Sequence, residues 1–176
     1  MDERKGYFHI YTGTGKGKTT AALGLAMRAA GAGLKTYIGE FVKYQEYSEV
    51  AVIRERFPEI KIELFGNEGL CINGRDLNEV DKKTAREGFD HSMTAMKSGE
   101  YDIVILDEIC IAVHTGALSE SDAMRFVEER PDNVDLVFTG RDATERMIDA
   151  ADLVTDMNEI KHYNNAGVES RKGIDC

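Results

Sequence analysis

The residue types and spacing best suited to chemistry occur in the run TGTGKGKTT at residues 12–20. Its three glycines allow backbone N–H groups to turn toward a phosphate chain, and a helix that starts there adds partial positive charge. The ammonium group of Lys18 would bind phosphate oxygens, with further positive charge from Lys16, and the Thr19 hydroxyl could ligate Mg²⁺ held against the phosphates. The run therefore indicates a phosphate-binding loop.

This loop is one residue shorter than the usual Walker A pattern. That pattern places a glycine five residues before Gly17, but the sequence has Thr12 there and its first glycine follows at Gly13. A glycine-rich hairpin or a helix cap is the alternative for so short a pattern. We favour the phosphate loop because the run lies between a predicted strand and a predicted helix, as such a motif requires.

A second motif is the run IVILDE at residues 103–108, in which a buried strand delivers Asp107 and Glu108 to its end. This arrangement resembles a Walker B motif, whose acid completes the Mg²⁺ shell directly or through water. Both carboxylates could be directed at the metal, or Glu108 could be the base that orients water in an ATPase. The sequence leaves both roles open.

A third motif, FTGRD at residues 138–142, places Arg141 just after another predicted strand. A guanidinium group at that rim could clamp phosphates. The alternative is a surface ion pair with Asp142 or Glu145.

The elements that must position these motifs alternate along the chain. We predict strands at residues 7–12, 35–42, 60–65, 103–106 and 134–138, with a sixth around 153–154, and helices at 19–30, 48–56, 77–97, 120–129 and 143–150. Ser119 and Asp142 are the expected N-caps of the last two helices, and residues 157–175 are expected to be a loop that could hold a short strand. The order predicts an α/β fold with a mostly parallel sheet and helices on both faces, which binds ligands at the carboxyl ends of its strands.

Composition narrows the function further. The 176 residues carry 22 basic and 32 acidic side chains, for a net charge of −10, which argues against nonspecific binding to nucleic acid or to an anionic membrane. The three cysteines, Cys71, Cys110 and Cys176, form no CxxC pair, and no apolar run is long enough to span a membrane. We expect one nucleotide-binding domain over residues 1–176, located in the cytoplasm.

Six blocks in order make the pattern specific: GTGKGKTTAALGLAMRAAGAG, EFVK, IVILDEI, LVFTGR, ADLVTDM and KHYNNAGVESRKGID. Together they resemble the P-loop type of ATP:corrinoid adenosyltransferase. The resemblance implies a RecA-like fold, a homodimer, and transfer of the 5′-deoxyadenosyl group of ATP to Co(I) of a reduced corrinoid with release of triphosphate. It also accounts for the short loop, because the family shows the same loop and binds ATP reversed relative to ordinary P-loop enzymes.

The resemblance further implies site residues and partners. Lys18, Thr19 and Glu108 would be catalytic, and Mg²⁺ or Mn²⁺ would be bound by Thr19, Asp107 and Glu108. The substrates would be ATP and a corrinoid such as cobalamin or cobinamide, and a reduced flavoprotein would donate electrons. The nucleotide-binding residues would be Gly13, Thr14, Gly15, Lys16, Gly17, Lys18, Thr19, Thr20, Arg28, Lys43, Arg141 and His162. A solvated helix residue is the alternative for Arg28, and a packed or surface histidine the alternative for His162.

The sequence departs from the family in one stretch that bears on corrinoid chemistry. The family commonly has a Gly-Phe-Thr-Trp run after the third strand, and the corresponding residues here are Gly69, Leu70, Cys71 and Ile72, in a chain without tryptophan. Two other functions therefore stay open beside adenosyl transfer. One is another P-loop ATPase or nucleotide kinase, and the other is a module that binds ATP or a corrinoid without catalysis.

Overall fold

One parallel sheet organises the computed structural model, which describes residues 4–43, 45–66 and 77–175. Its described strands lie in the order β3-β2-β4-β5-β1-β6, and every neighbouring pair is parallel. The strands are β1 Phe8–Thr12, β2 Thr36–Phe41, β3 Ile60–Phe65, β4 Ile103–Asp107, β5 Asp135–Thr139 and β6 Leu153–Asp156. The helices are α1 Lys18–Gly31, α2 Ser48–Arg56, α3 Glu79–Lys97, α4 Ile109–His114, α5 Glu120–Glu128 and α6 Glu145–Ala150, with a 3₁₀ turn at Tyr163–Ala166.

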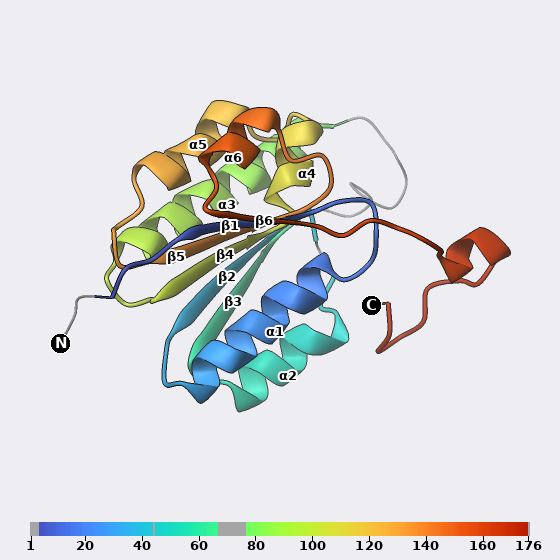
Figure 1. Ribbon diagram of the computed structural model, residues 1–176, viewed down its shortest axis with the longest axis horizontal. Coiled ribbons are helices and arrows are strands. Elements are labelled where there is room, and N and C mark those ends of the chain that lie inside the picture. Colours follow the sequence, from blue (N-terminus) through green and yellow to red (C-terminus); the bar gives the residue numbers. More distant parts are fainter. Residues whose placement is uncertain (1–3, 44, 67–76, 176) are drawn as a thin grey trace.

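Helices cover both faces of the sheet. Helices α1 and α2 lie on one face and α3, α4, α5 and α6 on the other (Figure 1). Because successive side chains of a strand point to opposite faces, each strand contributes side chains to the cores on both faces of the sheet. Ile38, Ile105 and Val137 pack toward α1 and α2, whereas Phe8 and Phe138 join the core under α3 to α6. The predicted α/β fold with a parallel sheet is confirmed, and it is consistent with a RecA-like P-loop fold.

The predicted elements are present with small shifts of their ends, and three details differ. Helix α4 was not predicted; it starts directly after Glu108 and is only six residues long. The expectation that Asp142 caps α6 is wrong, because Asp142 has a left-handed backbone (φ 59°) and the side chain of Thr144 caps the helix instead. The segment after β6 holds the 3₁₀ turn, which is capped by His162. Ser119 is confirmed as the N-cap of α5.

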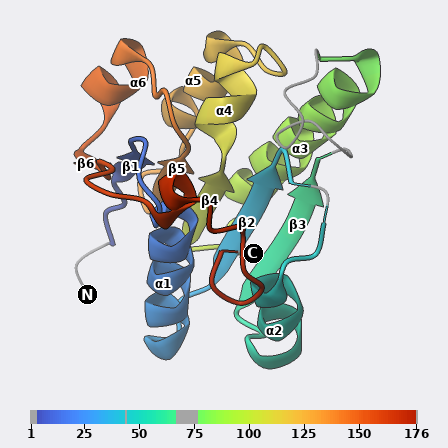
Figure 2. The same ribbon diagram turned by 90° about the vertical axis from the view of Figure 1, so that its right-hand side faces the viewer.

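The chain after β6 leaves the sheet at the carboxyl ends of the strands and turns back toward the start of α1 (Figures 1 and 2). This edge of the sheet also holds the loop between β1 and α1 and the ends of β4 and β5. The fold thus gathers at one edge all the motifs that the sequence singled out. None of the helices in the described part of the chain is both long and apolar enough to cross a membrane.

Candidate active site

The loop between β1 and α1 is held against the segment that follows β6. The amide of Gly15 donates a hydrogen bond to the Met157 carbonyl at 2.6 Å, and a Cβ atom at position 15 would lie only 2.6 Å from the same oxygen. Gly17 caps α1 with φ 121°, a conformation that side chains rarely allow. Glycine is therefore required at both positions, by close approach at the first and by backbone conformation at the second.

Lys18 is the first residue of α1, and its side chain turns back into the loop. It is only 7% exposed, and its Nζ donates hydrogen bonds to the carbonyl oxygens of Gly13 and Gly15, both at 2.7 Å. Burial lowers the pKa of Lys18, and the negative charge of Glu108 opposes that effect. The amine is thus fixed beside the N-terminus of α1, where backbone amides and a positive charge can bind one anion together.

Asp107 is the centre of a buried hydrogen-bond network. Its Oδ2 accepts a hydrogen bond from the Thr19 hydroxyl at 3.1 Å, and its Oδ1 accepts one from the Thr139 hydroxyl at 2.6 Å. The Thr139 oxygen in turn accepts a hydrogen bond from the Glu108 amide at 2.9 Å. The structure therefore brings together Thr19 from the first motif and Asp107 from the second, with Thr139 from the third as their support.

The oxygen atoms of Thr19 and Asp107 fit a magnesium ion shared with phosphates. Mg²⁺ prefers oxygen ligands, keeps several waters and commonly takes only one or two carboxylates from the protein. In the described residues, no group of three or more His, Cys, Asp or Glu side chains could hold a metal by itself. One hydroxyl and one carboxylate leave most ligand positions of such a cation to phosphate oxygens and water.

Lys43 and Glu40 complete the charged cluster. Glu40 lies beside Asp107 in the sheet register, on the same face as Ile38, and is fully buried. The Nζ of Lys43 lies 2.6 Å from Asp107 Oδ2 and 3.4 Å from Glu40 Oε1. Burial raises the pKa of Glu40 to about 7, although Lys43 counteracts this. Burial also disfavours the charged form of Lys43, but Asp107 and Glu40 outweigh it and raise the Lys43 pKa.

Sequence reasoning missed Glu40 and the role of Thr139. The signal that could have found them is the alternation of side chains along the strands, which puts Glu40, Asp107 and Thr139 on the face that α1 covers. The register of the three strands was also needed, and the sequence does not reveal it.

Backbone strain is concentrated around this cluster. The non-glycine residues with positive φ in the described chain are Val42, Glu108 and Asp142, and they follow the ends of β2, β4 and β5. Each such conformation costs about 1–3 kcal/mol, most for a β-branched residue such as Val42. Strained backbone conformations of this kind are common at functional sites, where they hold side chains in defined positions. The turn at Val42 brings Lys43 back over Asp107, and the turn at Glu108 starts α4.

Glu108 lies between positive groups. Burial raises its pKa, as does the charge of Asp107, whereas Lys43, Lys18 and Arg141 lower it. Arg141 itself is exposed beyond the end of β5. The neighbouring Asp142 faces His114, with 3.7 Å between Oδ2 and Nδ1. The structure therefore places Glu108 and Arg141 within electrostatic reach of the loop lysine.

Arg28 is not near the phosphate loop. It is exposed in the last turn of α1, ten residues after Lys18, which corresponds to about 15 Å along the helix axis. Its charge instead reaches Tyr11, where it opposes the rise that burial causes in the pKa of the phenol.

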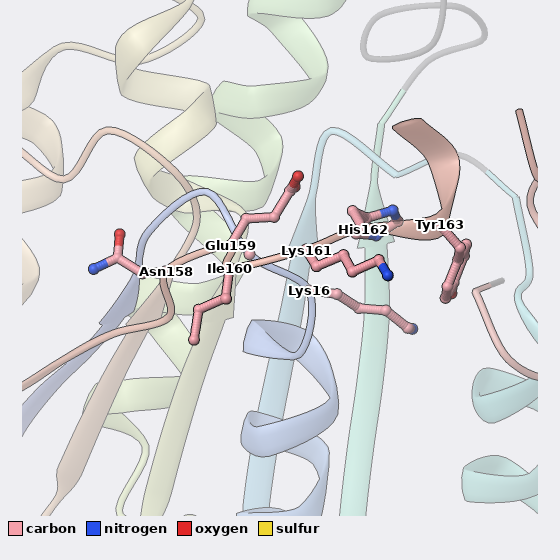
Figure 3. Close-up of a pocket in the computed structure, with 8 residues that line it drawn as sticks. Lys16, Asn158, Glu159, Ile160, Lys161, His162 and Tyr163 are labelled. Carbon is pink, nitrogen blue, oxygen red and sulfur yellow. The ribbon is translucent and has the colours of Figure 1, made fainter. Parts of the chain in front are cut away.

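A pocket of about 370 Å³ lies beside the loop, lined by Gly15, Lys16 and residues 158–163 (Figure 3). In it, the Lys16 and Lys161 side chains extend in the same direction, whereas Glu159 points away from them (Figure 3). The Nδ1 atom of His162 accepts a hydrogen bond from the backbone of its own 3₁₀ turn at 3.1 Å. The described segment after β6 therefore forms one wall of the candidate nucleotide site.

Lys16 and Thr14 tie the loop to this C-terminal wall. The Nζ of Lys16 donates a hydrogen bond to the Ile174 carbonyl at 2.6 Å and lies 3.5 Å from Asp175. The Thr14 hydroxyl accepts a hydrogen bond from the amide of Glu159 at 3.4 Å. Thr20, in contrast, is exposed on the first turn of α1. The stretch Gly69–Ile72, which replaces the aromatic run of the family, lies outside the described residues.

Comparison with known proteins identifies the family to which this chain is similar. Residues 4–176 match the family described as ATP:corrinoid adenosyltransferase BtuR/CobO/CobP. A corrinoid adenosyltransferase of Pseudomonas aeruginosa is 33% identical over 175 residues, covering 99% of this chain and 85% of the relative. One of Escherichia coli is 32% identical over 176 residues, covering 99% and 87%. An uncharacterised protein of Nostoc is 30% identical over 169 residues, and the match spans 45% of its length. The chain therefore belongs to the ATP:corrinoid adenosyltransferase family.

Proposed function

We propose that the protein transfers the 5′-deoxyadenosyl group of ATP to Co(I) of a reduced corrinoid and releases triphosphate. One observation carries this proposal: in a chain that matches this family, the short phosphate loop holds Lys18 inside it and Thr19 lies against Asp107. A loop of this kind grips a polyphosphate. In this reaction the polyphosphate is the leaving group, so the loop acts on the bond that breaks.

The loop residues stabilise the charge that develops as triphosphate departs. The bond from ribose C5′ to the phosphate oxygen breaks while the Co–C bond forms, and both bonding electrons of the C–O bond stay with the oxygen. Lys18 and the amides at the start of α1 face that negative charge, and the positive charge of Lys16 stabilises it further from the pocket side. Preorganised donors of this kind lower the barrier because they need no rearrangement during the reaction.

The hydroxyl of Thr19 and the carboxylate of Asp107 would hold Mg²⁺ or Mn²⁺, with Glu108 beside them. When bound, this cation supplies positive charge to the triphosphate oxygens. Thr139 keeps the Asp107 carboxylate oriented for that purpose by occupying its other oxygen.

The protein needs no nucleophile of its own, because the corrinoid supplies Co(I). Its remaining task is to align the ribose carbon with the cobalt and to keep water out. We place the triphosphate in the loop and the nucleoside beyond it, in the reversed orientation of the family. Arg141 would then bind the phosphates, and His162 would line the nucleotide pocket. Arg28, about 15 Å along α1 from Lys18, would contact the nucleoside rather than a phosphate.

The proposed function also names partners. Cobalamin or cobinamide would be the corrinoid and a reduced flavoprotein the electron donor, with the protein acting as a homodimer in the cytoplasm. The six blocks shared with the family and the family match support these assignments.

An anaerobic assay with ATP, Mg²⁺ and chemically reduced cob(I)alamin tests the proposal. We expect the Co(I) absorbance to disappear while intact triphosphate is released, and Lys18→Ala to slow this at least tenfold. Lys83→Ala, at an exposed position of α3, is the matched control and should behave as wild type. Formation of ADP and phosphate without a Co–C bond would identify an ATPase or kinase. ATP binding with no turnover would identify a binding module.

A further inference from the structure

The ammonium group of Lys43 lies where a metal ion would be expected. It contacts Asp107 Oδ2, the same oxygen that accepts the Thr19 hydrogen bond, at 2.6 Å. Its side chain is 15% exposed and that of Asp107 2%. A cation that binds Thr19 and Asp107 together must share this oxygen with Lys43 or displace it. At such short range two cations repel strongly, because the surroundings are buried.

Glu40 gives Lys43 a second place to bind. Its Oε1 is 3.4 Å from the Lys43 Nζ, beyond an ideal hydrogen bond but within a short side-chain movement. Its Oε2 is buried and has no hydrogen-bond partner among the described residues. A fully buried carboxylate with one weak contact and one open oxygen is unusual, because buried polar atoms are nearly always paired. The Lys43 side chain is the positive group that can satisfy it.

The sheet sets the spacing of the two acids, and Lys43 reaches both of them with its side chain. Glu40 and Asp107 are register partners on neighbouring central strands, so their separation is set by the sheet. Lys43 follows the left-handed turn at Val42, beyond the end of β2, and reaches the acids through a long flexible side chain. A shift of its Nζ from one carboxylate to the other therefore needs no movement of the sheet.

We propose that Lys43 is a resident cation for Asp107 that gives way to the metal–ATP complex by moving onto Glu40, with Glu40 as its positioning residue. The proposal rests on the function proposed above for the arrival of a metal with ATP at Asp107. Before ATP binds, Lys43 neutralises Asp107 and keeps free metal ions out. When the metal arrives with the nucleotide, Glu40 holds the displaced ammonium, so both carboxylates stay paired with a positive charge.

Binding of Mn²⁺, measured by electron paramagnetic resonance on the full chain with and without ATP and in the absence of corrinoid, tests this exchange. Lys43→Met removes the competitor, so Mn²⁺ should bind without nucleotide about tenfold more tightly than to wild type. Lys43→Arg keeps the charge and should restore the weak binding. Glu40→Gln removes the second position, so Mn²⁺ affinity in the presence of ATP should fall about tenfold. The double variant should match Lys43→Met in both conditions.

Lys82→Met, at an exposed position of α3 paired with Glu79, is the control for loss of a lysine, and thermal melting confirms that each variant is folded. Folded Lys43→Met with unchanged Mn²⁺ affinity would overturn the proposal, as would a Glu40→Gln variant that binds Mn²⁺ and ATP like wild type. If the wild-type enzyme nevertheless forms the Co–C bond, these results refute the Lys43 exchange and leave the proposed function intact. Normal exchange behaviour in a protein that forms no Co–C bond refutes the proposed function instead.

Discussion

Replacing Thr139 by valine should destabilise the protein far more than the small change in shape suggests. The Thr139 hydroxyl donates a hydrogen bond to Asp107 Oδ1 at 2.6 Å and accepts one from the Glu108 amide at 2.9 Å, and the residue is fully buried. Valine has nearly the same volume but neither hydrogen bond. The variant therefore leaves a carboxylate oxygen and an N–H group without their partner in the interior.

The magnitude follows from these two losses. An unsatisfied buried group costs about 1–3 kcal/mol, with a charged acceptor at the upper end. Allowing for partial relaxation, we expect Thr139→Val to lose about 3 kcal/mol. For a chain of this length, each kcal/mol shifts the melting temperature by about 2–4 °C, so the loss corresponds to about 6–12 °C. Thr139→Ser keeps the hydroxyl and removes one buried methyl group, which costs about 1 kcal/mol.

Scanning calorimetry of the two variants beside wild type measures this difference directly. We expect the order of melting temperatures to be wild type, then serine, then valine. If valine melts at or above the serine variant, packing of the methyl group outweighs the hydrogen-bond network. In that case Thr139 does not support Asp107 in the way the geometry indicates.

Two further predictions concern the surface. Asp175 accepts hydrogen bonds from the amide and side chain of Arg171. Asp175→Asn weakens these contacts, so trypsin should cleave after Arg171 several-fold faster, as measured by mass spectrometry of the digest. Glu169→Gln, at an exposed position, is the control and should not change the cleavage rate. Two hydrogen bonds from Arg86, each at 2.9 Å, lower the pKa of Asp122 to about 2. A depressed acid contributes stability that is present at neutral pH and is lost as pH falls from about 4 to about 2. Arg86→Leu should therefore reduce the loss of unfolding free energy between about pH 4 and about pH 2, measured by urea denaturation at several pH values. If the free energy of unfolding falls as steeply with pH as in wild type, the Arg86–Asp122 pairing does not contribute as described.

The phosphate loop and the acidic strand end were predictable because local sequence determines both. The glycines and lysines at residues 13–18 predict a phosphate loop because they lie between a strand and a helix. The run at 103–106 predicts a buried strand because all its residues are apolar. The carboxyl ends of parallel strands meet at one edge, so their meeting also followed from the fold class.

The Glu40–Lys43 contact could not be predicted, because it depends on features without a sequence signal. The register between β2 and β4 places Glu40 beside Asp107, and register is a tertiary property. The turn that returns Lys43 uses a left-handed valine, which local preference disfavours. Helix α4 was missed for a similar reason, because it starts at a left-handed Glu108 without a side-chain cap. At Asp142 local preference favoured a cap, but Asp142 lies in a left-handed turn and the cap of α6 is Thr144 instead.

The position of β1 in the sheet has a consequence for how the protein is made. The first strand of the chain pairs with β5 and β6, the last two strands, so that Tyr11 lies between Thr139 and Thr155. On the ribosome, β1 therefore lacks both neighbouring strands until residues 135–139 and 153–156 have been synthesised. The Met157 carbonyl that accepts the Gly15 amide emerges later still. The complete phosphate loop can thus form only after residue 157 has been synthesised, and before β5 and β6 are made both edges of β1 are unpaired and prone to aggregation.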